Sequence, residues 1–360
     1  MKRRARIGII GTGWWATHAH LPSLTSYPPA EVVALADSSP ERLAPAADHF
    51  GIDARYGDYR AMLDRGDLDG VVVATPHTTH SDIAAEVLRR GIPLMLEKPM
   101  VLRARDARDL VNLAEQRQIP FVIGYPYHFV EQHARLRTRI AEGALGQIQL
   151  THTLFASMVL EYYRANPQAY ADVFKWAVTG PRPTTYSEPS VSGGGQAQLQ
   201  VTHSAALLLW LTNLRPQEVA AFLESFDLQV DLCDAISVRF DTGAVGTLAS
   251  TGGIPAAQTA HQQLELRVYG SDGYALLDPM AGACSIYSND GSVEQLEETV
   301  ADRRYPLYAP ARHLVDLILD DDHAVVNMSP GEVGARTVEL LDAAYRSAAE
   351  RRVVRIDELD

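Results

Sequence analysis

Residues 7–16 read IGIIGTGWWA, an apolar run followed by two glycines and an alanine at the spacing G-x-G-x-x-A. In a strand–turn–helix unit, Gly11 would permit the tight turn, and Gly13 would let backbone N–H groups approach a pyrophosphate. Ala16 is small enough for the helix and the strand to pack closely. The alternative interpretation is an ordinary glycine turn, because the spacing alone is a weak signal.

The next apolar run, Glu31–Ala36, is followed directly by Asp37. This separation from the glycines is typical of the acid that bonds the adenosine ribose of a dinucleotide. A carboxylate there favours a free 2′-hydroxyl and repels a 2′-phosphate, and Ser38 follows it rather than an arginine. The sequence therefore predicts NAD and disfavours NADP, with a simple helix-capping role for Asp37 as the alternative.

The first 125 residues alternate short apolar runs with helix-like stretches. The runs are continuously apolar, as in strands that are covered on both faces. This alternation predicts an α/β Rossmann domain with a doubly wound parallel sheet over residues 1–125. We expect strands at Ala5–Ile10, Glu31–Ala36, Gly70–Ala74, Ile92–Leu96 and Ile119–Gly124, and helices at Ser81–Arg90 and Arg103–Gln116.

The pattern changes after Tyr125, and residues 126–360 are predicted to form an α+β domain. Two pairs of β-rich runs flank turn residues, which indicates hairpins. Residues 179–195 are rich in Pro, Ser, Thr and Gly and are predicted to form a long loop. We expect hairpins at 236–250 and 264–277, a strand at Gly146–Phe155, and helices at Val130–Glu142, Ser204–Leu211, Ala311–Leu319 and Pro330–Glu350.

The composition excludes several classes of protein. The 360 residues carry 32 basic and 45 acidic side chains, a net charge of −13, which argues against a nucleic-acid or membrane-surface protein. Cys233 and Cys284 have no ligand-like spacing, so neither a disulfide scaffold nor a metal site is expected. The basic start is followed by too short an apolar run for an export signal, which predicts a cytoplasmic protein.

Two further strand ends carry polar residues. Ligands of open α/β sheets bind outside the carboxyl ends of the strands, so these residues are expected at the rim that holds the cofactor. They are Thr75, Pro76, His77 and His80 after the third run, and Glu97 and Lys98 after the fourth. Thr12, Trp14 and Trp15 are expected beside the pyrophosphate, mainly through their backbone.

Lys98 precedes Pro99 and is therefore biased toward an extended conformation, which lets its ammonium project into the cleft. There it could exchange a proton with a substrate hydroxyl beside the nicotinamide. Burial would lower its pKa, and the neighbouring Glu97 would raise it. The alternative is a solvated ion pair in a turn.

Together these residues resemble the Gfo/Idh/MocA oxidoreductases, the relatives of glucose–fructose oxidoreductase and inositol dehydrogenase. The resemblance covers nearly the whole chain. It implies a C-terminal domain with a large open, mainly antiparallel sheet, a homo-oligomer (dimer or tetramer), and hydride transfer at a sugar or cyclitol carbon with Lys98 at the reaction centre. The matching elements are Gly11-x-Gly13-x-x-Ala16, Asp37, Thr75-Pro76 with His80, Glu97-Lys98-Pro99, Gly193-Gly194-Gly195 with His203, the hairpin Tyr269–Gly273, and Ala343–Ala348.

The chain departs from the family pattern at its second catalytic element. That element has a glycine run, an acid and a histidine four residues later, but here Leu199 stands at the acid's position. His203 keeps the histidine position and is the predicted base or proton relay, with a core histidine as the alternative. Gln200 could hydrogen-bond sugar hydroxyls.

Aromatic residues add candidates for the substrate pocket. Tyr127 and His128 are expected in the cleft, with packing under the domain junction as the alternative. Tyr162 and Tyr186 fall in irregular segments and could stack on a sugar ring.

The sequence therefore predicts an NAD-dependent oxidoreductase that acts on a secondary alcohol of a sugar, sugar derivative or cyclitol. One alternative is a redox-neutral NAD-dependent glycosidase or lyase that oxidises its sugar transiently. Another is a dinucleotide-binding regulator without turnover.

Overall fold

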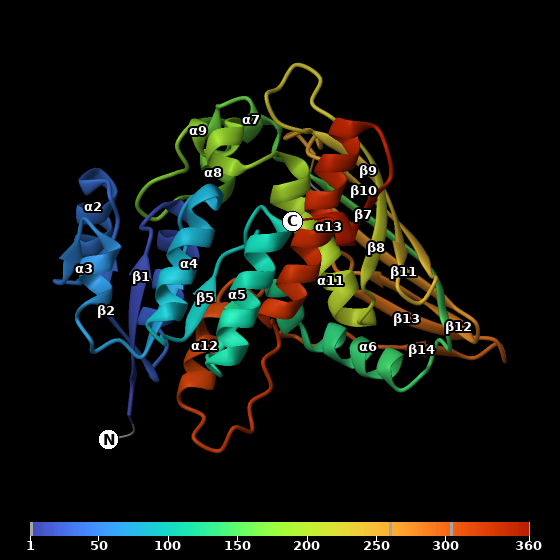
Figure 1. Cartoon of the computed structure of the whole chain (residues 1–360), viewed down its shortest axis with the longest axis horizontal. Coiled ribbons are helices and arrows are strands. Elements are labelled where there is room, and N and C mark those ends of the chain that lie inside the picture. The colour runs from blue at the N-terminus through green and yellow to red at the C-terminus, as the bar shows by residue number, and fades with distance from the viewer. Residues whose placement is uncertain (1–2, 259–260, 303–304, 360) are drawn as a thin grey trace.

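The computed structural model describes residues 3–258, 261–302 and 305–359, which form two sheets with helices between and around them (Figure 1). The smaller sheet comes from the N-terminal part of the chain, and the larger sheet comes from the C-terminal part. Helices in the middle of Figure 1 separate the two sheets.

Six parallel strands form the smaller sheet within the described ranges, in the order β3-β2-β1-β4-β5-β6. The order reverses between β1 and β4, and this switch point opens the crevice that receives ligands in doubly wound sheets. The predicted Rossmann sheet is confirmed. The strands are β1 (Ala5–Ile10), β2 (Ala30–Ala36), β3 (Arg55–Tyr56), β4 (Gly70–Val73), β5 (Leu94–Leu96) and β6 (Phe121–Ile123).

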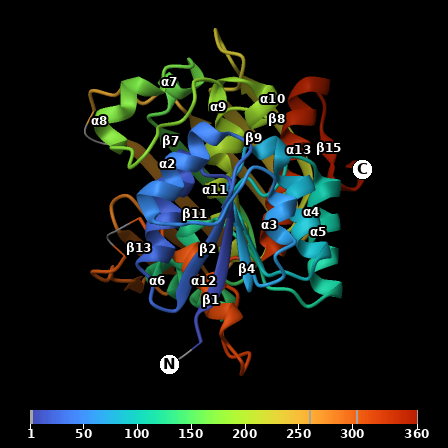
Figure 2. The same ribbon diagram turned by 90° about the vertical axis from the view of Figure 1, so that its left-hand side faces the viewer.

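Helices cover both faces of this sheet because both faces of its strands are apolar. In Figure 2, helix α2 lies to one side of the strands, whereas α4 and α5 lie to the other. The strand β4 is buried along its whole length between these covers. The helices are α1 (Leu21–Thr25), α2 (Pro40–Phe50), α3 (Tyr59–Leu63), α4 (His80–Arg89) and α5 (Ala104–Gln116).

Nine strands of the described chain form the larger sheet, in the order β14-β13-β12-β11-β7-β10-β9-β8-β15. Only the pair β10 and β7 is parallel among the pairings of these strands, so the predicted mainly antiparallel sheet is confirmed. The strands are β7 (Ile148–Ser157), β8 (Pro216–Glu224), β9 (Cys233–Phe240), β10 (Val245–Thr251), β11 (Gln262–Gly270), β12 (Gly273–Asp278), β13 (Ala283–Ser288), β14 (Val293–Gln295) and β15 (Val354–Arg355).

The inner face of the larger sheet packs on the helices α6 (Glu131–Ala141), α11 (Thr202–Thr212) and α13 (Gly331–Glu350). Strand β9 alternates buried and exposed side chains, which is the pattern of a sheet with one covered face. Helix α13 contacts both β8 and α5, so it ties the larger sheet to the Rossmann domain. Helix α11 is buried almost throughout, which explains its continuous apolar sequence.

The prediction of a long loop at 179–195 is wrong in part, because two single-turn helices lie within it. Together with two earlier short helices they form a segment at residues 160–192, which we call the cap and which lies at the top of Figure 1. Helices of four residues are too short to show an apolar period in the sequence. They are α7 (Leu160–Tyr163), α8 (Ala171–Phe174), α9 (Thr184–Ser187) and α10 (Pro189–Ser192).

The C-terminal part returns to the Rossmann sheet. Helix α12 (Ala309–Ile318) packs on it, and Ile123 donates a backbone hydrogen bond to Ser329 at 2.8 Å. The Ser329 hydroxyl in turn donates to the Ile123 carbonyl at 2.7 Å. None of the helices in the described ranges is long and apolar enough to cross a membrane.

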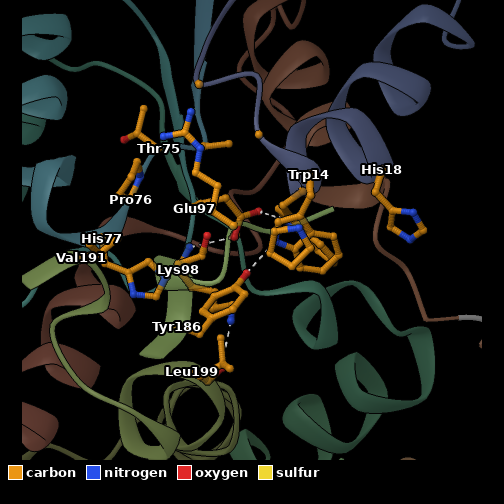
Figure 3. A pocket seen from close by; sticks show the side chains of 18 of the residues that line it. Trp14, His18, Thr75, Pro76, His77, Glu97, Lys98, Tyr186, Val191 and Leu199 are labelled. Carbon is orange, nitrogen blue, oxygen red and sulfur yellow. Dashed lines mark hydrogen bonds between the residues drawn. The ribbon is translucent and has the colours of Figure 1, made fainter. Parts of the chain in front are cut away.

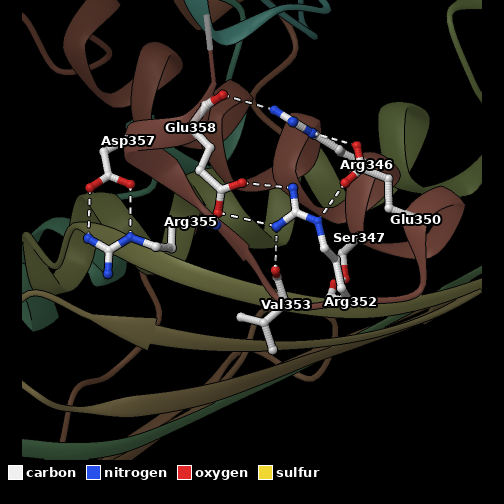
Figure 4. Close-up of polar contacts among 8 residues, drawn as sticks. All are labelled: Arg346, Ser347, Glu350, Arg352, Val353, Arg355, Asp357 and Glu358. Carbon is white, nitrogen blue, oxygen red and sulfur yellow. Dashed lines mark hydrogen bonds and ion pairs between the residues drawn. The ribbon is translucent and has the colours of Figure 1, made fainter.

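After α13 the chain turns back to add β15 to the larger sheet, and ion pairs hold this turn (Figure 4). Arg352 bonds Glu350 at 2.6 Å and Glu358 at 2.7 Å, and Arg355 bonds Asp357 at 2.7 Å. All these side chains are exposed to solvent, which screens their charges, so each pair contributes little by itself. Their joint effect is to fix the path of the chain after α13.

Candidate active site

A cavity of about 1290 Å³ lies at the carboxyl ends of the Rossmann strands, and the cap and the inner face of the larger sheet complete its walls. Most of the predicted site residues line it, whereas Thr12, His80 and His128 do not. The predicted residues that line the cavity are Gly11, Gly13, Trp14, Trp15, Asp37, Ser38, Thr75, Pro76, His77, Glu97, Lys98, Tyr127, Gln200 and His203.

The glycine turn has the geometry that a dinucleotide needs. Gly11 has φ +90°, and a Cβ there would lie 2.5 Å from the carbonyl oxygen of Ala74, so only glycine fits. Gly13 faces open space, because a Cβ there would meet nothing within 4 Å among the described residues. Backbone N–H groups of the turn are therefore accessible to a phosphate, and the residues present fit NAD.

Asp37 ends β2 and lies 8% exposed at one end of the cavity. Its Oδ2 accepts hydrogen bonds from the backbone N–H of Thr12 at 2.9 Å and from Arg42 Nε at 3.0 Å, and its Oδ1 accepts from Ser39 N at 2.9 Å. Burial raises the pKa of Asp37, but the hydrogen bonds outweigh it and hold the pKa below its usual value. Arg42 was not expected, because it reaches back from the first turn of α2.

His80 lies behind the rim rather than in it. Its Nδ1 lies 2.9 Å from the carbonyl oxygen of Pro99, and its Nε2 lies 2.9 Å from that of Thr75. The ring therefore joins the turns that follow β4 and β5.

His77, which lines the cavity, donates from Nδ1 to the carbonyl of Ser192 at 2.8 Å and so contacts the cap. Burial lowers the pKa of His77 to about 3, with His80 and Lys98 adding to the effect, so His77 is neutral.

Lys98 Nζ donates a hydrogen bond to the backbone carbonyl of Leu199 at 2.9 Å (Figure 3). Leu199 belongs to a π-helical turn, Ala197–Val201, that precedes α11 and widens the helix at this point. Burial lowers the pKa of Lys98 to about 8, opposed by the charge of Glu97. The Lys98–Pro99 peptide bond is cis. Thus a backbone oxygen contacts the ammonium at the position where the family has an acid.

The Glu97 carboxylate bonds groups other than the Lys98 ammonium. Its Oε1 accepts from Trp15 Nε1 at 2.8 Å and lies 2.9 Å from His20 Nε2, while its Oε2 accepts from the backbone N–H of Lys98 at 3.0 Å. Burial raises the pKa of Glu97, but His20, Lys98 and Trp15 outweigh it, so the group stays ionised. The pair is not the solvated ion pair of the alternative interpretation, because Glu97 is only 8% exposed.

His203 lies one helical turn beyond Leu199 and is 7% exposed. Burial, and then the charge of Lys98, lower its pKa well below 6.5, so the imidazole is neutral at pH 7. Its Nδ1 and the hydroxyl of Tyr127 are buried without a hydrogen-bond partner in the described part of the chain. The two rings lie 6.0 Å apart between centroids. Both residues line the cavity, and buried polar atoms without a partner beside a cavity are consistent with a functional site.

His128 is buried outside the cavity, where its ring stacks on Trp210 at 4.8 Å and 8°. Its Nδ1 lies 3.1 Å from the Ser329 hydroxyl. This position agrees with the alternative interpretation, in which His128 packs under the domain junction. It does not support the predicted contact between His128 and the substrate. Thr12 is also buried and does not line the cavity; its backbone N–H and hydroxyl bond Asp37 and so tie the glycine turn to that residue. The described residues contain no group of three or more side chains that could hold a metal ion.

Comparison with known families accounts for most of the chain. Residues 5–125 match the model described as "Oxidoreductase family, NAD-binding Rossmann fold". Residues 133–276 match the model of the GFO/IDH/MocA C-terminal domain.

The chain belongs to the Gfo/Idh/MocA family.

Individual curated relatives share about a quarter to a third of their aligned residues with this chain. The chain is 34% identical to the rhizopine catabolism protein MocA of Rhizobium meliloti over 148 residues, which cover 41% of this chain and 45% of that protein. It is 24% identical to the levoglucosan dehydrogenase of Pseudarthrobacter phenanthrenivorans over 298 residues, 74% of this chain and 72% of that protein. The chain spans less than half the length of the first curated relatives that it matches.

Solved structures of the Gfo/Idh/MocA type share the fold over the whole chain. GenD2 from gentamicin A biosynthesis, solved in complex with NAD, superposes with a TM-score of 0.77 at 23% identity, covering 99% of this chain and 97% of that one. Levoglucosan dehydrogenase in complex with NADH and levoglucosan gives a TM-score of 0.79 at 19% identity, with 98% and 100% covered.

Proposed function

We propose that this chain transfers hydride between NAD and a secondary alcohol of a sugar, sugar derivative or cyclitol. The observation that carries the proposal is the approach of Lys98 and His203 to one cavity that begins at the glycine turn. These two residues come from different domains, and the Lys98 charge is close enough to lower the pKa of His203. Membership of an NAD-binding oxidoreductase family supports the reaction class.

NAD would lie with its pyrophosphate on the turn at Gly11 and Gly13 and its adenosine ribose toward Asp37 and Ser38. Thr75, Pro76 and His77 would then line the path toward Lys98. When bound, NAD supplies the acceptor or donor of the hydride at its nicotinamide ring.

The protein's part is to hold the alcohol and to move its proton. Neutral Lys98 can take the hydroxyl proton as the C–H hydrogen leaves as hydride, and the resulting ammonium is held on the Leu199 carbonyl. His203 would contact the same reacting hydroxyl as Lys98, and Tyr127 and Gln200 would orient the remaining hydroxyls, because all these side chains line one cavity. His203 can also pass the proton onward, since it is neutral at pH 7.

The test is to follow reduced nicotinamide by absorbance while the protein meets NAD and a panel of sugars and cyclitols. We expect accumulation with at least one substrate. Lys98→Met should abolish it, whereas Lys175→Met should not, because Lys175 is an exposed lysine outside the cavity. A Lys98→Met variant with undiminished turnover would contradict the proposal.

A second candidate follows from Leu199, which removes the acid of the usual relay. A redox-neutral glycosidase or lyase oxidises its sugar only transiently, so it would release sugar from a glycoside without net accumulation of reduced nicotinamide. Measuring both products in one reaction separates the two enzymes. A regulator without turnover would show neither product and would retain its NAD binding and its biological role in the Lys98→Met variant.

The division into a cofactor domain at residues 1–125 and a substrate domain at residues 126–360 belongs to the same proposal. A cytoplasmic location and a homo-oligomeric state also stay predictions.

A further inference from the structure

Four aromatic rings form one side of the cavity, and we call them the aromatic wall. Trp14 comes from the start of the first Rossmann helix, and Tyr162, Phe174 and Tyr186 come from the cap. The Trp14 ring lies 6.4 Å from Tyr162, 6.0 Å from Phe174 and 6.5 Å from Tyr186 between centroids. Tyr162 lies 5.8 Å from Phe174 and 5.4 Å from Tyr186. The wall therefore joins the cofactor domain to the cap.

The polar end of Trp14 is already used within the wall. Its Nε1 donates a hydrogen bond to the Tyr186 hydroxyl at 2.8 Å (Figure 3). Val173 of the cap and Val159, the residue before the cap, line the cavity as well and extend its apolar surface. Arg42 and Arg182 are engaged at the other end of the cavity, through hydrogen bonds to Asp37 and Ser39. The Tyr162 hydroxyl has no hydrogen-bond partner in the described part of the chain, but it is buried, so the wall presents mainly ring surface to the cavity.

The aromatic wall lies beside the proposed reaction centre. Tyr186, which bonds Trp14, also lies 6.4 Å between ring centroids from His77, a residue of the rim that carries Lys98 (Figure 3). Tyr162 and Leu199 also belong to one apolar cluster. A group on the wall is therefore near enough to belong to the same molecule whose hydroxyl meets Lys98.

We propose that the aromatic wall binds an aryl aglycone, so that the substrate is a sugar linked to a planar apolar group. This inference rests on the proposed function. A planar ring can stack against or meet the edges of Trp14, Phe174 and Tyr186, which Tyr162 supports from behind, and it gains from the area that it buries. A second sugar ring would bring several hydroxyls to a surface whose Trp14 N–H is already paired, and unpaired hydroxyls are costly to bury.

Calorimetric titration of the protein saturated with NADH tests the proposal, because the reduced cofactor prevents oxidation of the sugar. The ligands are phenyl and methyl glycosides in pairs, as both anomers of glucose, galactose, mannose and xylose. For at least one sugar, the phenyl glycoside should bind about tenfold tighter than its methyl partner. Equal affinity within every pair would overturn the proposal.

Variants assign the preference to the wall. Phe174→Ala and Tyr162→Ala should each reduce the phenyl-to-methyl ratio toward one. The matched control is Phe226→Ala, which removes a phenylalanine that is 70% exposed and outside the cavity, and it should keep the ratio. A ratio that survives both wall substitutions would overturn the assignment. The assignment would also be overturned if methyl β-cellobioside bound as tightly as the phenyl glycoside, because the aromatic wall would then bind a second sugar ring.

The outcome is separable from that of the proposed function. The affinity ratio requires no turnover, whereas the proposed function is tested by accumulation of reduced nicotinamide with oxidised NAD. A phenyl preference without any turnover would support the aryl subsite and contradict the dehydrogenase. Turnover together with equal affinities for the phenyl and methyl glycosides would support the dehydrogenase and contradict the aryl subsite.

Discussion

Replacement of Lys98 by arginine should remove the main pH dependence of sugar oxidation. Lys98 has a pKa of about 8 because of burial, against an ordinary value of 10.5. At pH 7 roughly a tenth of the side chains is therefore neutral, compared with about 0.03% for an unperturbed lysine. Burial thus increases the fraction of competent base about 300-fold, and the shift corresponds to roughly 3 kcal/mol. Arginine keeps the positive charge and the donors but cannot accept a proton.

The assay is log(kcat/KM) for oxidation between pH 6 and pH 10, measured with saturating NAD. The wild-type profile should rise with a slope near one and level off above about pH 8, where Lys98 becomes neutral. The Lys98→Arg variant should be slower by about 10²–10⁴-fold and should lack the inflection. An inflection near pH 6.5 in both proteins would refute the reasoning, because an unperturbed histidine would then control the rate.

Four further changes have defined outcomes. Lys98→Met should raise the free energy of unfolding at pH 7 by about 1–2 kcal/mol after allowance for solvent screening. Between about pH 8 and pH 10.5, Lys98 of the wild-type protein is neutral in the folded state but still protonated in the unfolded state, so the wild-type protein becomes more stable as the pH rises. The stability advantage of the Lys98→Met variant in thermal melts should therefore shrink through that pH range and vanish above it. Leu199→Asp would place a carboxylate near Lys98 and should move the kinetic inflection up by about one pH unit, which a repeated pH profile checks. Asp37→Asn should increase kcat/KM for NADP relative to NAD about tenfold or more, since it removes the charge that repels a 2′-phosphate and weakens the hold on Arg42; an unchanged ratio would contradict this role. Gly11→Ala should weaken NAD binding more than tenfold by titration, because the added Cβ would meet the Ala74 carbonyl at a φ of +90°.

The Rossmann half of the fold was predictable because its signals are local. Continuous apolar runs such as Gly70–Val73 are required by strands with two covered faces, and glycines are required at turns such as Gly11. The cap was not predictable, because single-turn helices such as α9 show no period. Its aromatic residues instead contact rings that are distant in the sequence, such as Trp14.

Most of the side chains that line the cavity were predictable, but the contacts between them were not. Strand ends placed Lys98 at the rim, and the family resemblance singled out His203. The Leu199 carbonyl escaped notice because a leucine at an acid's position suggests loss of a partner, whereas the backbone of a π-helical turn provides one. The anchoring of Glu97 by Trp15 and His20 could not be foreseen either, because it depends on how the first helix packs on β5.

The central claim is that Lys98 and His203 meet one substrate hydroxyl beside the nicotinamide. A crystal structure with NADH and the sugar that has the highest kcat/KM tests this most directly. We expect a single substrate oxygen within hydrogen-bond distance, about 3 Å, of both Lys98 Nζ and an imidazole nitrogen of His203, with the adjacent carbon facing the nicotinamide. A substrate bound away from Lys98, or a dinucleotide seated anywhere but on the glycine turn, would contradict the account.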